Sequence, residues 1–133
     1  MHLIIDGYTS DQKILQDTEF LYQLLDSYPS QIGMTKISQP FVTGYVGPRP
    51  EEWGVSGFVV IAESHISVHT FVERSYVNID VFSCGDFDAQ KVVEDLKNRF
   101  RLTRFRSYLV NRGWSTCGSV GSDKVIELCS HEK

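Results

Sequence analysis

Long apolar runs are absent from the sequence, and none approaches the 18 residues that a membrane-spanning helix needs. The opening segment Met1–Tyr8 has neither the cationic start nor the small-residue cleavage site of a secretory signal, which favours a cytoplasmic protein. Cysteines are few, and Cys84, Cys117 and Cys129 form no Cys-x-x-Cys pair. Neither a disulfide framework nor a metal site is therefore predicted, and any one of these thiols is free to be reactive.

Cationic residues are too few for a protein that binds nucleic acid or an anionic membrane. The 13 Lys and Arg residues are outnumbered by 17 Asp and Glu residues, which gives a formal net charge of -4 at pH 7. Phosphate groups are bound by cationic surface, so we expect neither a nucleic-acid nor a membrane partner. The arginines between Arg99 and Arg112 are interpreted as the solvated face of a strand and a helix end.

Several enzyme motifs are also missing. The sequence has no G-x-S-x-G elbow, no G-x-G-x-x-G after a predicted strand and no P-loop. Hydrolases of the elbow type, dinucleotide-binding enzymes and P-loop nucleotidases therefore have no support.

The composition is that of one ordinary globular domain. Of the 133 residues, 41% are hydrophobic and 23% are charged, which suits a single core and leaves no room for separate modules. We expect one domain over residues 1–114. Residues 115–133 are expected to form a C-terminal tail of unknown role, with one candidate strand at Val125–Leu128.

Apolar patterns predict a sheet. The run Phe58–Ala62 is continuously apolar, so it is interpreted as the middle strand, covered on both faces. The segment Thr43–Trp53 contains two glycines and two prolines and is expected to be an irregular surface loop. The predicted strands are His2–Tyr8, Met34–Val42, Phe58–Ala62, the alternating segments around Ile66 and Val68 and around Val77, Ile79 and Val81, and Leu102–Val110.

Two helices are predicted between these strands. Asp17 can cap the first, whose apolar residues recur at helical spacing until Pro29 discourages its continuation. The second begins after Asp86 or Asp88 and runs through Phe100. The order of elements predicts an α+β fold, a two-layer α/β sandwich with an antiparallel or mixed sheet and two helices on one face.

Side chains that could carry chemistry gather in the segment Glu63–His69. Ser64 lies at a turn, whereas Ser67 and the two histidines share one face of a strand by the period of two. This pattern alone does not establish a hydrolase dyad, because outward-facing Ser and His are common on strands. Cys84 follows a strand and is either a small buried residue or a thiol that reaches a pocket, and Glu73 by itself is interpreted as a solvated charge.

Three ordered blocks are more specific than any single residue. They are Gly54-Val55-Ser56-Gly57, Glu63-Ser64-His65-Ile66-Ser67-Val68-His69-Thr70 and Val81-Phe82-Ser83-Cys84-Gly85. In order and spacing they resemble the bacterial and archaeal small-subunit S-adenosylmethionine decarboxylases, the pyruvoyl enzymes of polyamine synthesis. The resemblance runs from His2 to about Arg112. The family's α/β sandwich, which pairs two protomers, agrees with the fold predicted from the residues.

The resemblance implies a role for each reactive residue. Ser64 would attack the carbonyl of Glu63, and the chain would cut itself between these residues to leave a pyruvoyl group derived from Ser64. His69 would take the Ser64 α-proton, with Ser56 assisting the rearrangement. The pyruvoyl carbonyl would condense with the substrate amine and accept electrons as CO2 departs, and Cys84 would protonate the product.

The resemblance also implies how substrate is held. Glu63, Phe71 and Glu73 would bind it, the Glu73 carboxylate accepting hydrogen bonds from ribose hydroxyls. A homodimer of processed protomers is implied, with sites at its interface. Each site would combine Ser64 and Cys84 of one chain with Ser56, His69 and Glu73 of the other.

Two departures from the family pattern concern the substrate pocket. The family usually has an aromatic residue and then proline before the acid, whereas this chain has Phe71-Val72-Glu73. The segment Gly47–Trp53 places Pro50 where the family has the aromatic residue that stacks on adenine. The residues that could stack instead are Trp53, Tyr45 and Phe71.

The main hypothesis is a self-processing decarboxylase of S-adenosylmethionine, which supplies the aminopropyl donor for spermidine. A second hypothesis keeps the pyruvoyl machinery and changes the small-molecule substrate to arginine or ornithine. A third is a noncatalytic ligand-binding relative. The presence of Ser64, His69 and Cys84 at the family's spacing argues against the third, because a decayed site has no reason to retain all three.

Overall fold

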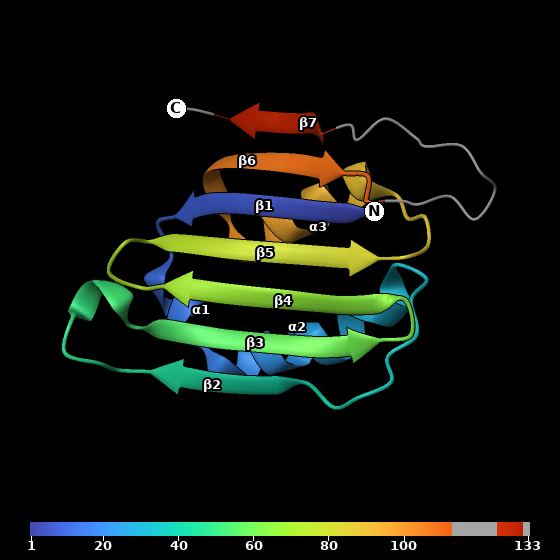
Figure 1. The fold of residues 1–133 in the computed structure, drawn as a ribbon. Helices are drawn as coiled ribbons and strands as arrows, with labels where there is room; N and C mark the ends of the chain where they lie inside the picture. The colour runs from blue at the N-terminus through green and yellow to red at the C-terminus, as the bar shows by residue number, and fades with distance from the viewer. Residues whose placement is uncertain (113–124, 132–133) are drawn as a thin grey trace.

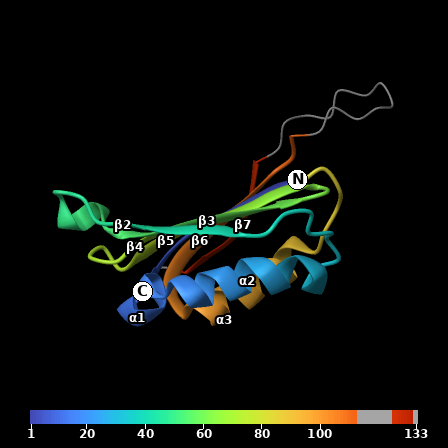
Figure 2. The same cartoon turned by 90° about the horizontal axis from the view of Figure 1, so that it is seen from below.

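The chain folds into a seven-stranded sheet with its helices on a single face (Figures 1 and 2). The computed structural model describes residues 1–112 and 125–131. Paired strands are antiparallel, in the order β2-β3-β4-β5-β1-β6-β7, so the predicted α+β sandwich is confirmed with an antiparallel sheet. The strands are β1 (His2–Thr9), β2 (Phe41–Tyr45), β3 (Gly54–Ile61), β4 (Ser64–Phe71), β5 (Tyr76–Ser83), β6 (Leu102–Val110) and β7 (Val125–His131).

Three α-helices lie in the described part of the chain, one more than predicted. They are α1 (Gln12–Gln16), α2 (Thr18–Gln31) and α3 (Ala89–Phe100), and a 3-10 turn, η1, spans Pro50–Glu52. Asp17 caps α2 as predicted, and its carboxylate accepts a hydrogen bond from the Phe20 amide at 2.9 Å. Asp88, one of the two predicted caps, does the same for α3 through the Lys91 amide at 3.0 Å. Helix α1 was missed because five residues are too few to produce a periodic pattern.

Helix α2 continues past Pro29 to Gln31, contrary to the prediction. Pro29 stands in the last turn, so its missing N–H removes a hydrogen bond only near the helix end. The amides of Ile32 and Met34 both donate to the Pro29 carbonyl, at 3.2 and 2.9 Å, and this closes the helix as a tight turn.

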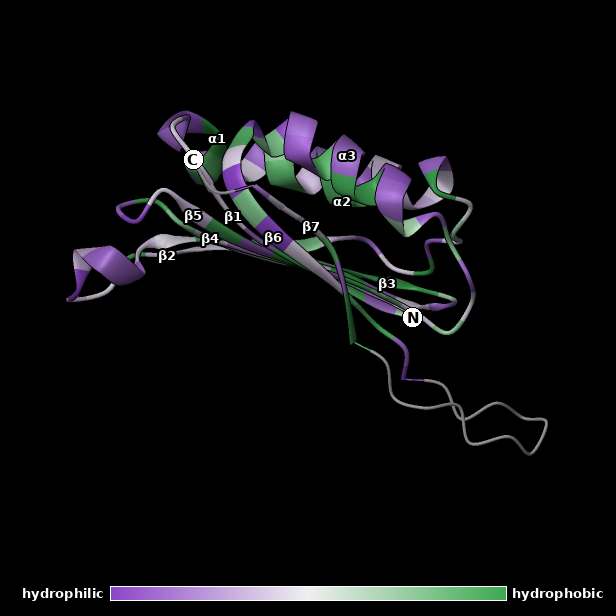
Figure 3. Cartoon of the chain, turned by 90° about the horizontal axis from the view of Figure 1, so that it is seen from above, coloured by the Kyte–Doolittle hydropathy of each residue, from purple (hydrophilic) through white to green (hydrophobic). Residues whose placement is uncertain are grey.

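The core lies between the helices and one face of the sheet. Alternate strand residues such as Leu3, Val59 and Ile79 are fully buried there. Apolar residues of α2 and α3, including Leu25 and Phe100, cover them. Hydropathy colouring shows the polar side of α3 turned away from the sheet (Figure 3). Burial of one helix stripe and one sheet face is the expected driving force for this two-layer fold.

The interpretation of Phe58–Ala62 as the middle strand is wrong. It belongs to β3, which lies next to the edge strand β2, and β5 occupies the middle of the sheet. Val59 and Ile61 are buried under the helices, whereas Phe58 and Val60 remain 46% and 36% exposed on the opposite face. A continuously apolar strand calls for cover on both faces, and no described element of this chain covers the second.

The strand predicted at Met34–Val42 is wrong over most of its length. Strand β2 begins at Phe41 and extends into the segment predicted to be a loop, Thr43–Trp53. Pro40 has no N–H for a ladder, so regular pairing starts after it. Before it, Lys36 forms an isolated bridge with Ile61.

Strand β7 extends the sheet at the far edge. It pairs with β6 and includes the candidate strand Val125–Leu128. Residues 113–124 and 132–133 of the predicted tail lie outside the described residues. Within the described ranges, no helix is long and apolar enough to span a membrane.

The buried hydroxyl of Thr70 ties β4 to its neighbours, and we expect Thr70→Val to destabilise the fold. Its Oγ1 accepts from the Val55 amide at 2.8 Å and donates to the Leu15 carbonyl at 2.7 Å. Valine keeps the shape but leaves both groups without this partner, so the free energy of unfolding should fall by about 1–3 kcal/mol. Urea unfolding measures the change. Thr70→Ser retains the hydroxyl, and an equal loss in that variant would contradict the hydrogen-bond explanation.

Candidate active site

In the turn between β3 and β4, Ser64 has a strained backbone conformation. Ala62 and Glu63 form a two-residue hairpin connection, and neither has a positive φ. Such connections normally use primed turns with positive φ, which match the twist of the strands. Here Ser64 itself has φ 153°, a value that L-residues rarely adopt and that costs on the order of 1–3 kcal/mol. The bond before Ser64 therefore lies in a strained stretch of backbone.

Strand β5 brings Cys84 to this turn. Ser64 is opposite Ser83 in the β4–β5 register, and the Cys84 amide donates to the Glu63 carbonyl at 2.8 Å. The Ser83 hydroxyl accepts a hydrogen bond from the Gly85 amide at 3.0 Å, which stabilises the separate turn that follows β5. Cys84 is exposed and forms no disulfide, so the alternative interpretation as a small buried residue is wrong.

A second group, Ser56 and His69, lies farther along the same sheet. They face each other across β3 and β4, and His69 Nδ1 is 2.9 Å from Ser56 Oγ. His69 is five residues beyond Ser64 on β4, which corresponds to about 17 Å along a strand. Within one chain, the imidazole therefore does not reach Ser64.

A groove on the open face of the sheet connects the two groups. It has a volume of about 620 Å³. It is lined by Phe41, Ser56, Gly57, Phe58, Val60, Ser64, His65, Ser67 and His69. The rings of Phe41 and Phe58 pack against each other at 5.7 Å, although both side chains remain about half exposed. An apolar groove with hydroxyl and imidazole groups at its ends has the usual composition of a binding site.

Two of the predicted substrate-binding residues, Phe71 and Glu73, lie near the far end of β4 but in different surroundings. Phe71 lies against Tyr76, with ring centroids 6.1 Å apart, and the Arg74 guanidinium is 5.7 Å from the Phe71 ring. Burial, followed by the nearby Asp6 carboxylate, raises the pKa of Tyr76, so this phenol is neutral at physiological pH.

Glu73 instead lines a pocket of about 370 Å³ at the end of the sheet. Two of the predicted stacking candidates, Tyr45 and Trp53, line the same pocket. The Trp53 indole N–H donates to the Gly47 carbonyl at 2.6 Å, which fixes the ring in the segment that departs from the family pattern. The pocket therefore combines a carboxylate with two aromatic surfaces.

Comparison with known proteins identifies the family of this chain. A sequence model of S-adenosylmethionine decarboxylase matches residues 1–113. The chain belongs to the S-adenosylmethionine decarboxylase family. A relative from Thermoplasma volcanium, an S-adenosylmethionine decarboxylase proenzyme, is 38% identical over 129 residues, which cover 96% of this chain and 92% of the relative. A proenzyme of the same name from Archaeoglobus fulgidus is 30% identical over 113 residues, covering 84% and 96%.

A solved structure supports the same assignment. The crystal structure of the adenosylmethionine decarboxylase from Aquifex aeolicus matches with a TM-score of 0.66 and 28% identity, covering 80% of this chain and 83% of that one. The family resemblance and the sandwich fold predicted from the sequence are both confirmed.

In this S-adenosylmethionine decarboxylase family member, the structure brings together some predicted site residues and not others. Glu63, Ser64 and Cys84 meet at one end of β4, and Ser56 and His69 form a pair farther along it. The apolar groove residues Phe41 and Phe58 were not predicted. The continuous apolar run around Phe58 was the available signal, but it was interpreted as interior to one chain.

Proposed function

We propose that this chain is a self-processing, pyruvoyl-dependent decarboxylase of S-adenosylmethionine, which supplies the aminopropyl donor for spermidine synthesis. The observation that carries the proposal is the strained Glu63–Ser64 turn with the Cys84 amide on the Glu63 carbonyl. The names of the relatives, decarboxylase proenzymes, support both the reaction and the processing.

Self-cleavage follows from the groups at this turn. The Ser64 hydroxyl oxygen attacks the Glu63 carbonyl carbon, and the Cys84 N–H faces the oxygen on which negative charge develops. The C–N bond breaks, its nitrogen takes a proton, and an ester replaces the amide and relieves the strain at Ser64. His69 of a second chain then removes the Ser64 α-proton, and the new C-terminal carboxylate of residue 63 leaves from the Ser64 Cβ. Water releases ammonia from the dehydrated residue and leaves a pyruvoyl group.

The residues around this position fit a pyruvoyl group. When formed, that group supplies a carbonyl that binds the substrate amine and accepts electrons as CO2 leaves. Cys84 lies at the adjoining strand end and is exposed, so its thiol can deliver a proton to the α-carbon of the product.

We further propose that two chains pair through their open sheet faces, so that each site combines Ser64 and Cys84 with Ser56, His69 and Glu73 of the other chain. The separation of about 17 Å between Ser64 and His69 along β4 supports this assembly. The exposed apolar side chains of Phe41, Phe58 and Val60 support it as well, since a second sheet would remove them from water.

The pocket of Glu73, Tyr45 and Trp53 favours a nucleoside-bearing substrate. A carboxylate can accept hydrogen bonds from two ribose hydroxyls, and aromatic faces stack on a purine. Arginine and ornithine have neither ribose nor purine.

Release of labelled CO2 tests the substrate. The cleaved protein is supplied separately with carboxyl-labelled S-adenosylmethionine, arginine and ornithine. We expect release from S-adenosylmethionine alone. Release mainly from arginine or ornithine would overturn the substrate assignment and leave the processing chemistry intact, whereas a chain that never cleaves would overturn the whole proposal.

We expect Cys84→Ala to separate processing from turnover. The alanine variant keeps the backbone N–H that faces Glu63, so the chain should still cleave to a substantial extent. Decarboxylation should fall by roughly 100- to 10,000-fold, the usual contribution of a general acid. Mass spectrometry of the fragments and CO2 release per pyruvoyl group measure the two effects. Normal turnover to the normal amine would show that the thiol is structural.

A further inference from the structure

The segment between α2 and β2 lies beside the end of β3, close to the turn that contains Glu63 and Ser64 (Figure 1). The Ala62 amide donates to the Thr35 carbonyl at 2.8 Å, and the Ile37 amide donates to the Val60 carbonyl at 3.0 Å. The Val60 amide in turn donates to the Ser38 hydroxyl at 3.1 Å. Residues 35–38, called the brace below, thus occupy the edge of β3 next to Val60 and Ala62, before β2 begins at Phe41.

The brace also contacts Glu63 directly. The Thr35 amide donates to the Glu63 carboxylate at 3.1 Å, while the Cys84 amide donates to the Glu63 carbonyl at 2.8 Å. Glu63 is therefore held by N–H groups from two segments that are distant in the sequence. The residue on the acyl side of the predicted cleavage point is fixed through its main chain and its side chain.

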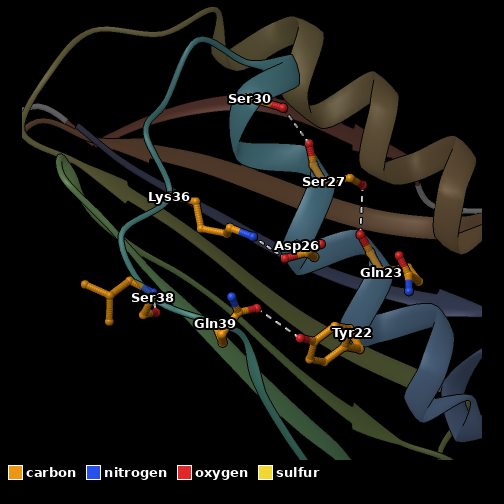
Figure 4. A network of polar contacts seen from close by, with 9 residues as sticks. Tyr22, Gln23, Asp26, Ser27, Ser30, Lys36, Ser38 and Gln39 are labelled. Carbon is orange, nitrogen blue, oxygen red and sulfur yellow. Dashed lines mark hydrogen bonds and ion pairs between the residues drawn. The ribbon is translucent and has the colours of Figure 1, made fainter.

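Helix α2 anchors the brace. Lys36 forms an ion pair with Asp26 of α2, and both side chains are about one-third exposed. Next to the brace, Gln39 accepts a hydrogen bond from Tyr22 of the same helix at 3.2 Å. Figure 4 shows these two contacts reaching from the loop to one side of α2.

We infer that the brace, fixed to α2 by the Lys36–Asp26 ion pair, is a positioning device for self-cleavage that holds the Glu63 carbonyl for attack by Ser64. The inference rests on the proposed function. The acyl shift needs the hydroxyl oxygen and the carbonyl carbon at near-contact distance, and misplacement by about 1 Å can slow such a step by up to 100-fold. Without the brace, the backbone N–H and C=O groups of Val60 and the N–H of Ala62 lose their hydrogen-bond partners, and the end of β3 becomes more mobile. Lys36 and Asp26 act through the backbone and touch neither reacting atom.

The rate of self-cleavage of the full chain tests the brace. We expect Lys36→Met to slow cleavage roughly five- to fiftyfold, because the segment loses its anchor while its backbone remains. Ser38→Ala, which removes the acceptor of the Val60 amide, should act in the same direction. Lys36→Arg should keep the rate near that of the unsubstituted chain, and the exchange Asp26→Lys with Lys36→Asp should recover most of it. Once cleaved, every variant should decarboxylate normally per pyruvoyl group.

A matched control is available on α3. Lys91 pairs with Asp95 at 2.7 Å in a surface ion pair within one helix, which anchors no described loop near the cleavage turn, and Lys91→Met should cleave as fast as the unsubstituted chain. Equal rates for Lys36→Met and Lys91→Met would overturn the inference, as would a charge exchange that recovers nothing. These outcomes leave the proposed function standing, whereas failure of the unsubstituted chain to cleave removes both.

Discussion

The Ser64→Ala chain should remain a single polypeptide of 133 residues, with no fragments corresponding to residues 1–63 and 64–133. A methyl group has no nucleophilic atom, so the acyl shift cannot begin and cleavage should fall by at least about a thousandfold. No pyruvoyl group would form, and decarboxylation should be lost with it. Denaturing mass spectrometry over a prolonged incubation measures the intact and cleaved species.

Ser67→Ala is the matched control for this change. Ser67 carries the same side chain on the same strand, three residues farther along β4 and away from the turn. Its variant should cleave normally. Fragments from Ser64→Ala that end at residue 63 would show that another nucleophile cuts this bond and would contradict the role assigned to Ser64.

Mixing two inactive variants should restore self-cleavage if the site is shared between chains. A His69→Ala chain alone keeps the nucleophile but lacks the base, whereas a Ser64→Ala chain alone keeps the base. In a mixed dimer, one site combines the intact Ser64 of the first with the intact His69 of the second. Cleavage of the His69→Ala chain should rise from near zero to roughly half, the share of those chains that random pairing places in mixed dimers.

The control partner is a chain with both Ser64→Ala and His69→Ala, which pairs but supplies no imidazole. Mass labels on the two chains distinguish which one is cut. No cleavage in the first mixture, despite subunit exchange shown with the labels, would mean that His69 acts on its own chain. The separation along β4 predicts the opposite, because five strand residues span about 17 Å.

Local patterns predicted much of the fold correctly. Asp17 was predicted to begin a helix because its carboxylate caps free amides, and it does. The alternation around Ile66 and Val68 identified a strand with one buried face, since strand side chains point to opposite sides in turn. Helix α1 and the segment before Pro40 were predicted wrongly, because short length and irregular pairing leave no periodic signal. The place of Phe58–Ala62 in the sheet and the helix end at Pro29 were also wrong.

The site was harder to predict than the fold. From the residues alone, Ser64, His69 and Cys84 could also be interpreted as ordinary outward-facing or buried side chains. Only the three ordered blocks linked them to a family. The contact between the Cys84 amide and Glu63 joins positions 21 residues apart through the β4–β5 register. The hydrogen bond from the Thr35 amide to the Glu63 carboxylate joins positions 28 residues apart. Neither leaves a mark in local composition.

By itself, the sequence determined the family, the two-layer architecture and the residue types available for self-cleavage, because capping, periodicity and motif spacing are local properties of the chain. Only the tertiary structure decided which of those residues meet. Strand pairing places Glu63, Ser64 and Cys84 at one end of β4 and keeps His69 away from them, since neighbouring strands align residues that are remote along the chain. It also decided that Phe58 and Val60 lie on the open face, because strand order, which no single segment encodes, determines which apolar surface the helices cover.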